Sequence, residues 1–199
     1  MALSRLLSAL AVAAALLSPA GPGRAAPLVE PAAAGPGTLQ TFSTGELVQS
    51  GHSFFGNVSR GLALTVEEAV RRFGEPNAYI LGQEASGALI GGVTYGEGTV
   101  YTKRGRGQRV YWQGPSIGFD VGGDGSRNMM LVYNLRSVPA LYRRFLEVEG
   151  SAFVFAGFGV TAARADDTVI VPIRSGVGLR LGVSLGYLKF TDAPTWNPF

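Results

Sequence analysis

The sequence predicts a mainly β protein with flanking helices (α+β): a small closed antiparallel β-barrel, preceded by a helical N-terminal segment and containing one inserted helix. Short apolar runs separated by glycine clusters fill residues 78–135 and 151–190, a spacing typical of antiparallel strands joined by tight turns. Within the second region, residues 177–187 alternate strictly between apolar and small or polar side chains. The chain has 29 glycines and 16% charged residues, which suits a compact, strongly curved sheet.

Residues 1–25 have the pattern of a secretory signal peptide. Arg5 provides the positive charge, an apolar run covers residues 6–17, and small residues surround the expected cleavage site after Ala25. The run is shorter than the roughly 20 residues that a membrane-spanning helix needs, although an uncleaved N-terminal anchor is the alternative. The chain has no cysteine, so the lipoprotein route is closed. We therefore expect export to the periplasm and a soluble protein after cleavage.

Composition predicts a flexible leader and then a single domain. Residues 26–42 are rich in proline, alanine and glycine without any period, and residues 43–199 form the expected domain. The formal net charge of +3 includes Arg5 and Arg24, which both precede the expected cleavage site. The remaining chain is close to neutral, which argues against a nucleic acid partner.

Two helices are expected ahead of the strands. Apolar residues recur every three to four positions over residues 44–58 and 62–73, which is the helical period. Thr65 and Glu68 match a capping box for the second helix, and Gly74 marks its end.

Three further segments have distinct patterns. A third helix is expected over residues 138–149, where Leu141 and Phe145 lie four positions apart. Residues 128–133 are apolar on both faces, which predicts a central strand. Residues 104–107 alternate arginine and glycine and predict the tip of a β-hairpin.

The residues provide no convincing active site. The single histidine, His52, is expected on the apolar side of the first helix as a packed or boundary residue. Residues 114–118 match the G-x-S-x-G pattern of a nucleophile elbow, but the residues after Ser116 alternate like a strand, whereas that elbow leads into a helix. No catalytic residue, metal ligand or cofactor is predicted.

A cationic and aromatic cluster is the remaining candidate site. Basic side chains surround the predicted hairpin tip, and aromatic residues follow it. Such a surface could bind anionic lipid headgroups, lipopolysaccharide phosphates or an envelope protein, or it could be an ordinary solvated turn. The candidate residues are Lys103, Arg104, Arg106, Arg109, Tyr111 and Trp112.

Several motifs resemble those of the EipA-type envelope integrity proteins over about residues 43–199. These motifs are GHSFFG at 51–56, YILGQEASG at 79–87, YGEG at 95–98, YWQGPS at 111–116, MMLVYN at 129–134, VPIRSGVG at 171–178 and TWNPF at 195–199. The resemblance implies a signal peptide, a periplasmic small β-barrel with flanking helices and a role in cell-envelope integrity. No catalytic residues are established for the family that could be carried over. A more distant similarity to the SYLF domain implies a barrel that binds lipid.

These observations lead to two hypotheses. The first is a non-catalytic periplasmic protein that supports envelope integrity by binding an envelope component, which is a lipid, lipopolysaccharide or an envelope protein. The alternative is a SYLF-like lipid-binding module that acts at a membrane surface.

Overall fold

The computed structural model describes residues 39–56, 60–87, 92–116, 126–175, 186–195 and 197. The predicted signal peptide, most of the leader and most of the alternating segment 177–187 lie outside these residues. The helices are α1 (Thr44–Phe55), α2 (Arg60–Phe73) and the short 3-10 helix η1 (Val138–Leu141). The strands are β1 (Ala78–Gly87), β2 (Gly92–Thr102), β3 (Gln108–Ser116), β4 (Ser126–Tyr133), β5 (Arg144–Glu147), β6 (Phe153–Phe155), β7 (Phe158–Val160), β8 (Ala163–Ala165), β9 (Thr168–Ser175) and β10 (Tyr187–Thr191).

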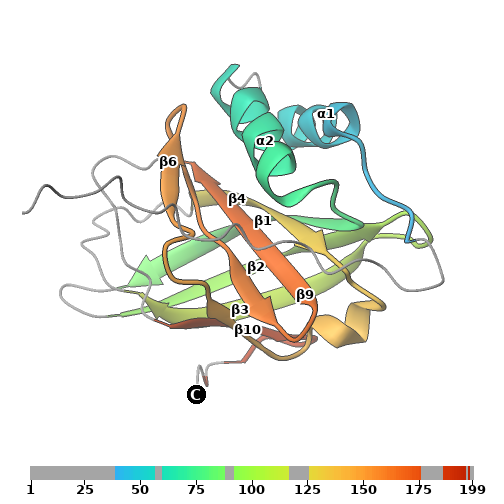
Figure 1. The fold of residues 1–199 in the computed structure, drawn as a ribbon. Coiled ribbons are helices and arrows are strands. Elements are labelled where there is room, and N and C mark those ends of the chain that lie inside the picture. Colours follow the sequence, from blue (N-terminus) through green and yellow to red (C-terminus); the bar gives the residue numbers. More distant parts are fainter. Residues whose placement is uncertain are drawn as a thin grey trace, which may run out of the picture.

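Eight of the described strands form a closed antiparallel barrel. Their order around the barrel is β4-β1-β2-β3-β10-β5-β8-β9, and the pairing of β4 with β9 closes the circle. Strands β6 and β7 form a hairpin that extends the sheet from β9 and stands beside α2 (Figure 1). The predicted fold class, a small barrel with flanking helices, is confirmed.

The barrel is packed with side chains. Alternate residues of each strand point inward, and Trp112, Phe145 and Phe190 are the largest of the fully buried ones. The rings of Trp112 and Phe145 both lie near that of Phe190, with centroid separations of 6.0 and 5.7 Å. Aliphatic side chains complete this interior cluster: Ile80, Val100, Val110, Met130, Val132, Leu135, Leu141, Ile170 and Leu188.

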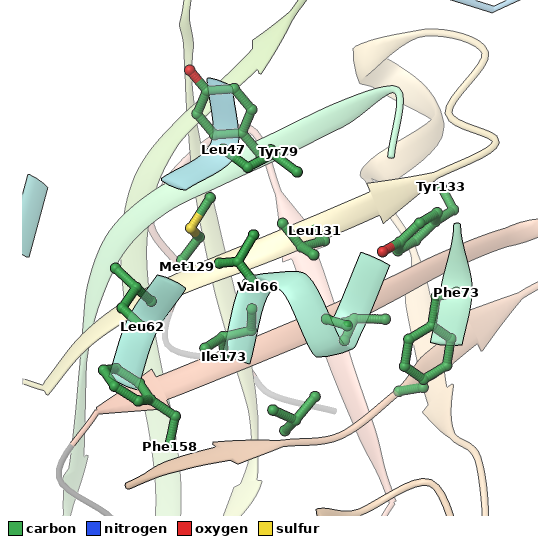
Figure 2. Packing of buried hydrophobic residues seen from close by; sticks show 14 of the residues in the cluster. Leu47, Leu62, Val66, Phe73, Tyr79, Met129, Leu131, Tyr133, Phe158 and Ile173 are labelled. Carbon is green, nitrogen blue, oxygen red and sulfur yellow. The ribbon is translucent and has the colours of Figure 1, made fainter. Parts of the chain in front are cut away.

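A second core lies outside the barrel, where α1 and α2 cover β1, β4 and β9 (Figure 1). Figure 2 shows the side chains that meet here, among them Leu62, Val66 and Phe73 from α2, Met129, Leu131 and Tyr133 from β4, and Ile173 from β9. Burying an aliphatic or aromatic side chain of this size contributes about 1.5–3 kcal/mol, so this face holds the helices on the barrel.

Strand β4 lies between these two cores. Its residues 128–133 are buried on both faces, and it pairs with β1 on one side and β9 on the other. The prediction of a central strand is confirmed. Its even-numbered residues fill the barrel and its odd-numbered residues face the helices, which explains why the run has no polar face.

The helix predicted over residues 138–149 is wrong. The segment begins with η1 and then continues as strand β5, which pairs with β10 and β8. Leu141 and Phe145 are both fully buried in the barrel, Leu141 from η1 and Phe145 from the strand. Their spacing of four resembled a helical face, but the barrel needs a strand here to close.

The N-terminal boundary and the helix caps also differ from expectation. Phe42, assigned to the leader, is buried, and its ring centroid lies 4.9 Å from that of Tyr79. The domain therefore begins before residue 43. The capping box lies at the start of α1, where Ser43 and Glu46 bond each other's backbone N–H groups. The box predicted at Thr65 is wrong: α2 already begins at Arg60, and the Thr65 hydroxyl donates to backbone carbonyls.

Candidate functional site

The predicted hairpin tip is confirmed. Strands β2 and β3 pair down to Val100 and Gln108, and residues 103–107 connect them with exposed side chains. Arg104 and Arg106 are both exposed, and no acidic side chain in the described residues forms an ion pair with either. The tip therefore presents two unneutralised guanidinium groups to solvent.

Lys103 joins this tip to the first helix. Its Nζ lies 2.5 Å from Glu46 Oε1 of α1 and 4.6 Å from the centroid of the Phe42 ring. Hydrogen bonds from Lys103 and from Ser43 lower the pKa of Glu46 from 4.5 to about 2. Lys103 is thus a structural contact as well as a charge, and it fixes the tip against the start of α1.

The aromatic part of the candidate cluster divides between two faces of β3. Tyr111 lies on the outer face with Arg109, whose Nη2 is 3.1 Å from Glu97 Oε2. The Tyr111 hydroxyl and the Glu97 carboxylate raise the pKa of Arg109. Trp112 points the other way: it is 1% exposed inside the barrel and cannot belong to the outer surface. Strand alternation explains this correction, since adjacent residues point to opposite faces.

The Trp112 indole belongs instead to a buried polar layer. Its Nε1 donates to Glu84 Oε2 at 3.1 Å, and Asn128 Nδ2 donates to the same oxygen at 3.0 Å. Arg174 Nε donates to Glu84 Oε1 at 2.6 Å. The Glu84 side chain is 6% exposed, so its charge is balanced by a guanidinium and two neutral donors. We call these four residues, from β1, β3, β4 and β9, the mouth layer.

Glycines make room for this layer. A Cβ on Gly96 would lie 2.1 Å from Trp112 Cε2, and one on Gly82 would lie 2.6 Å from Trp112 Cη2. Gly96 is the register partner of both Glu84 and Trp112, so the indole crosses β2 over a position without a side chain to reach the carboxylate. The glycine-rich strands therefore serve a close side-chain approach.

The mouth layer and the hairpin tip lie at opposite ends of the barrel. Strand β1 begins opposite Thr102, next to the tip, and ends at Gly87, beyond Glu84. At the tip end, Asn77 ties the chain after β4 in place through two hydrogen bonds with the backbone of Leu135. Buried Leu135 and Leu141 fill the interior there. Among the described residues, apolar side chains fill the interior near the tip, and the polar mouth layer lies toward the other end.

The described residues contain no catalytic arrangement that the sequence suggested. His52 is exposed on α1, which corrects its placement on the apolar side. Gly114 and Ser116 belong to β3, and a Cβ on Gly114 would lie 2.3 Å from the Tyr187 carbonyl oxygen of β10. Close strand packing therefore accounts for this glycine of the G-x-S-x-G match.

Within the described ranges, no group of three or more histidine, aspartate or glutamate side chains could hold a metal ion. No described helix has the length and apolarity to cross a membrane.

Sequence reasoning missed the mouth layer because its members are far apart in the chain. Glu84 and Arg174 are separated by 90 positions, and only the barrel brings them together. A weak signal in the sequence was a polar residue at an inward position of a strand whose other inward residues are apolar or small. Such residues are Glu84 in β1, Asn128 in β4 and Arg174 in β9. A polar residue at an inward position requires a partner, so each one points to another across the sheet.

These features define a class of protein: a small closed β-barrel with a helix-covered outer face, an exposed cationic hairpin and a buried polar layer. Comparison with known families identifies it further. The chain belongs to the envelope integrity protein A (EipA) family, whose model matches residues 40–199. The resemblance of the sequence to the EipA-type proteins is therefore confirmed.

A solved structure agrees with this assignment. The crystal structure of a beta-barrel-like, uncharacterized protein from Brucella abortus has a TM-score of 0.73 and 57% sequence identity, and the match covers 80% of this chain and 99% of that one. Neither description names an enzymatic activity. No curated protein matches the chain.

Proposed function

We propose that this protein is an exported, non-catalytic component of the periplasm that supports envelope integrity by binding another envelope component through the hairpin tip. The observation that carries the proposal is the exposed pair Arg104 and Arg106, whose charges no described carboxylate neutralises. Membership of the envelope integrity family supports the role, and the signal-like N-terminus supports the compartment.

The tip is suited to binding an anionic partner. Its neighbouring charges are already paired, Lys103 with Glu46 and Arg109 with Glu97, so the tip is held in place by contacts that leave the two arginines available. Arginine forms paired hydrogen bonds with phosphate and carboxylate groups, which envelope lipids, lipopolysaccharide and acidic proteins all carry. Tyr111 and Arg109 lie further along β3 and could extend the contact surface.

The lipid-binding alternative is not favoured. Holding an acyl chain inside the barrel would require displacing buried side chains such as Trp112, Phe145 and Phe190. Native mass spectrometry of protein purified from the periplasm tests this directly. A reproducible co-purifying lipid would support the alternative over the proposal.

Complementation of a deletion strain tests the proposal. We expect the deletion to sensitise cells to detergent and envelope-targeting antibiotics, and Arg104→Glu with Arg106→Glu to fail to restore tolerance although the protein folds and is exported. The matched control is Arg60→Glu with Arg164→Glu, which makes the same change in charge at exposed arginines away from the tip. Full rescue by the tip variant would contradict the proposed surface, and unchanged tolerance of the deletion strain would contradict the role.

A further inference from the structure

The mouth layer contains an arginine whose donors are mostly unused. Glu84 fixes Arg174 through Nε, and the Arg174 side chain is 23% exposed. Its two Nη groups have no hydrogen-bond acceptor in the described structure. A guanidinium held in this way presents a planar pair of N–H groups, which is the geometry that binds the two oxygens of a carboxylate.

An unused acceptor lies beside these donors. Asn128 is fully buried, and its Oδ1 has no hydrogen-bond partner among the residues that the structure describes. Its orientation is fixed because Nδ2 donates to Glu84, so a flipped amide would set two acceptor oxygens against each other. Asn128 and Arg174 are direct register partners on β4 and β9. A buried acceptor without a donor is unfavourable, and a ligand N–H could satisfy it.

The charge of the layer limits what can bind. Glu84 lies against Arg174, so the pair is close to neutral and the buried carboxylate repels further negative charge. A singly charged group is therefore favoured over a doubly charged phosphate.

We propose that the mouth of the barrel binds a ligand carboxylate. The Nη groups of Arg174 hold its oxygens, and Asn128 Oδ1 accepts from an adjacent N–H, the arrangement found at the free carboxyl end of a peptide. Glu84, to which Trp112 also donates, positions the arginine and the asparagine. The site lies at the opposite end of the barrel from the hairpin tip, so it stands whether or not the tip binds a partner.

An NMR titration of the exported protein tests this proposal. The indole N–H of Trp112 reports on the layer because it donates to Glu84, and Trp196→Phe distinguishes it from the second tryptophan. N-acetylalanine, which has a carboxylate beside an amide N–H, should shift this resonance saturably in the millimolar range. Its methyl ester, which lacks the charge, should not shift it, and acetate, which lacks the N–H, should bind more weakly.

Substitutions then locate the site. Arg174→Lys keeps the charge opposite Glu84 but loses the paired Nη groups, and should weaken N-acetylalanine binding about tenfold or more. Arg164→Lys, on the exposed face of β8, is the matched control and should bind normally. If Arg174→Lys does not fold, Glu84→Gln combined with Arg174→Gln gives a neutral pair that should fold and bind no carboxylate.

Three results would overturn the proposal. The first is no saturable shift with N-acetylalanine, and the second is equal affinity in the wild-type protein and Arg174→Lys. The third is tighter binding of inorganic phosphate than of N-acetylalanine, which would contradict the carboxylate class. If Arg174→Lys no longer binds N-acetylalanine but still restores tolerance to the deletion strain, the hairpin proposal stands. If the hairpin-tip variant fails to restore tolerance but binds N-acetylalanine normally, the mouth proposal stands.

Discussion

The two polar regions of this barrel are built in different ways. The hairpin tip draws its charges from a short stretch of chain, and its ion pairs are exposed, such as Arg109 with Glu97. The mouth layer draws single residues from four strands and buries the Glu84 carboxylate at 6% exposure. The tip depends on local geometry, whereas the mouth layer depends on the barrel being closed.

This difference has an energetic consequence. Exposed ion pairs contribute between zero and about 1 kcal/mol, because water screens them and long side chains lose entropy. A buried charge without its partner costs several times more. The tip can therefore change with little effect on folding, which suits a surface for recognition, whereas the mouth layer couples any ligand it binds to the packing of the barrel.

The largest contrast is expected between two glycines. Gly96→Ala places a Cβ about 2.1 Å from Trp112 Cε2 and should destabilise the protein by about 3 kcal/mol, since neither strand nor indole can move freely. Gly105→Ala, at the tip, has its nearest neighbour at 3.4 Å and should cost less than about 0.5 kcal/mol. Urea denaturation measures both free energies of unfolding.

A second substitution checks the cause. Trp112→Phe removes the part of the ring that the new Cβ meets, so Gly96→Ala should cost less in that background. Equal losses from Gly96→Ala and Gly105→Ala would contradict the close approach described for the mouth layer.

A contrast of nearly the same size is expected between two glutamates. Glu84→Ala leaves Arg174, Trp112 Nε1 and Asn128 Nδ2 without their acceptor and should cost about 3 kcal/mol. Glu97→Ala breaks the exposed pair with Arg109 and should cost about 0.5 kcal/mol or less. The measurement is the free energy of unfolding at neutral pH.

A double-mutant cycle of Glu84→Ala with Arg174→Ala should show a favourable coupling of more than about 1 kcal/mol. Additive losses would show that the two side chains do not interact as the 2.6 Å contact implies.

The smallest expected effect is the loss of stability in acid that comes from the Lys103–Glu46 ion pair, which links the tip to α1. The pKa of Glu46 is about 2 in the folded protein against 4.5 for the free group, so acid favours the unfolded state. The stability that Glu46 contributes is fully present above pH 4.5 and is lost as the pH falls toward 2. Glu68, whose pKa is also lowered by Arg71 and Arg72, acts in the same direction.

Comparing wild type with Glu46→Gln isolates this contribution. The loss of stability between neutral pH and about pH 3 should be smaller in Glu46→Gln, while the part due to Glu68 remains. In Lys103→Met, the pKa of Glu46 measured by NMR should rise, since Lys103 is the largest cause of its shift. Identical acid profiles of wild type and Glu46→Gln would contradict the role of this pair.

Much of the fold could be predicted from local patterns. Helical spacing placed the first two helices within a few residues of α1 and α2, and the run 128–133, apolar on both faces after Asn128, identified β4. The arginine–glycine alternation correctly placed the hairpin tip. These features follow from neighbours in sequence, which fix periodicity and turn chemistry.

The failures share one physical origin. Phe145 belongs to a strand because β10 and β8 need a partner between them, and Phe42 belongs to the core because Tyr79 covers it. Trp112 was predicted on the candidate surface because the local sequence does not show which face of β3 it occupies, and it lies inside the barrel. In each case a contact distant in sequence outweighed the local pattern.

The sequence by itself determined an envelope integrity family member with a barrel, two helices and a cationic hairpin, because these depend on composition, periodicity and local turns. Only the tertiary structure decided that Glu84, Trp112, Asn128 and Arg174 form one layer, since their contacts cross the barrel between residues up to 90 positions apart. Closing the sheet sets which inward positions meet, and that register cannot be read from any one strand.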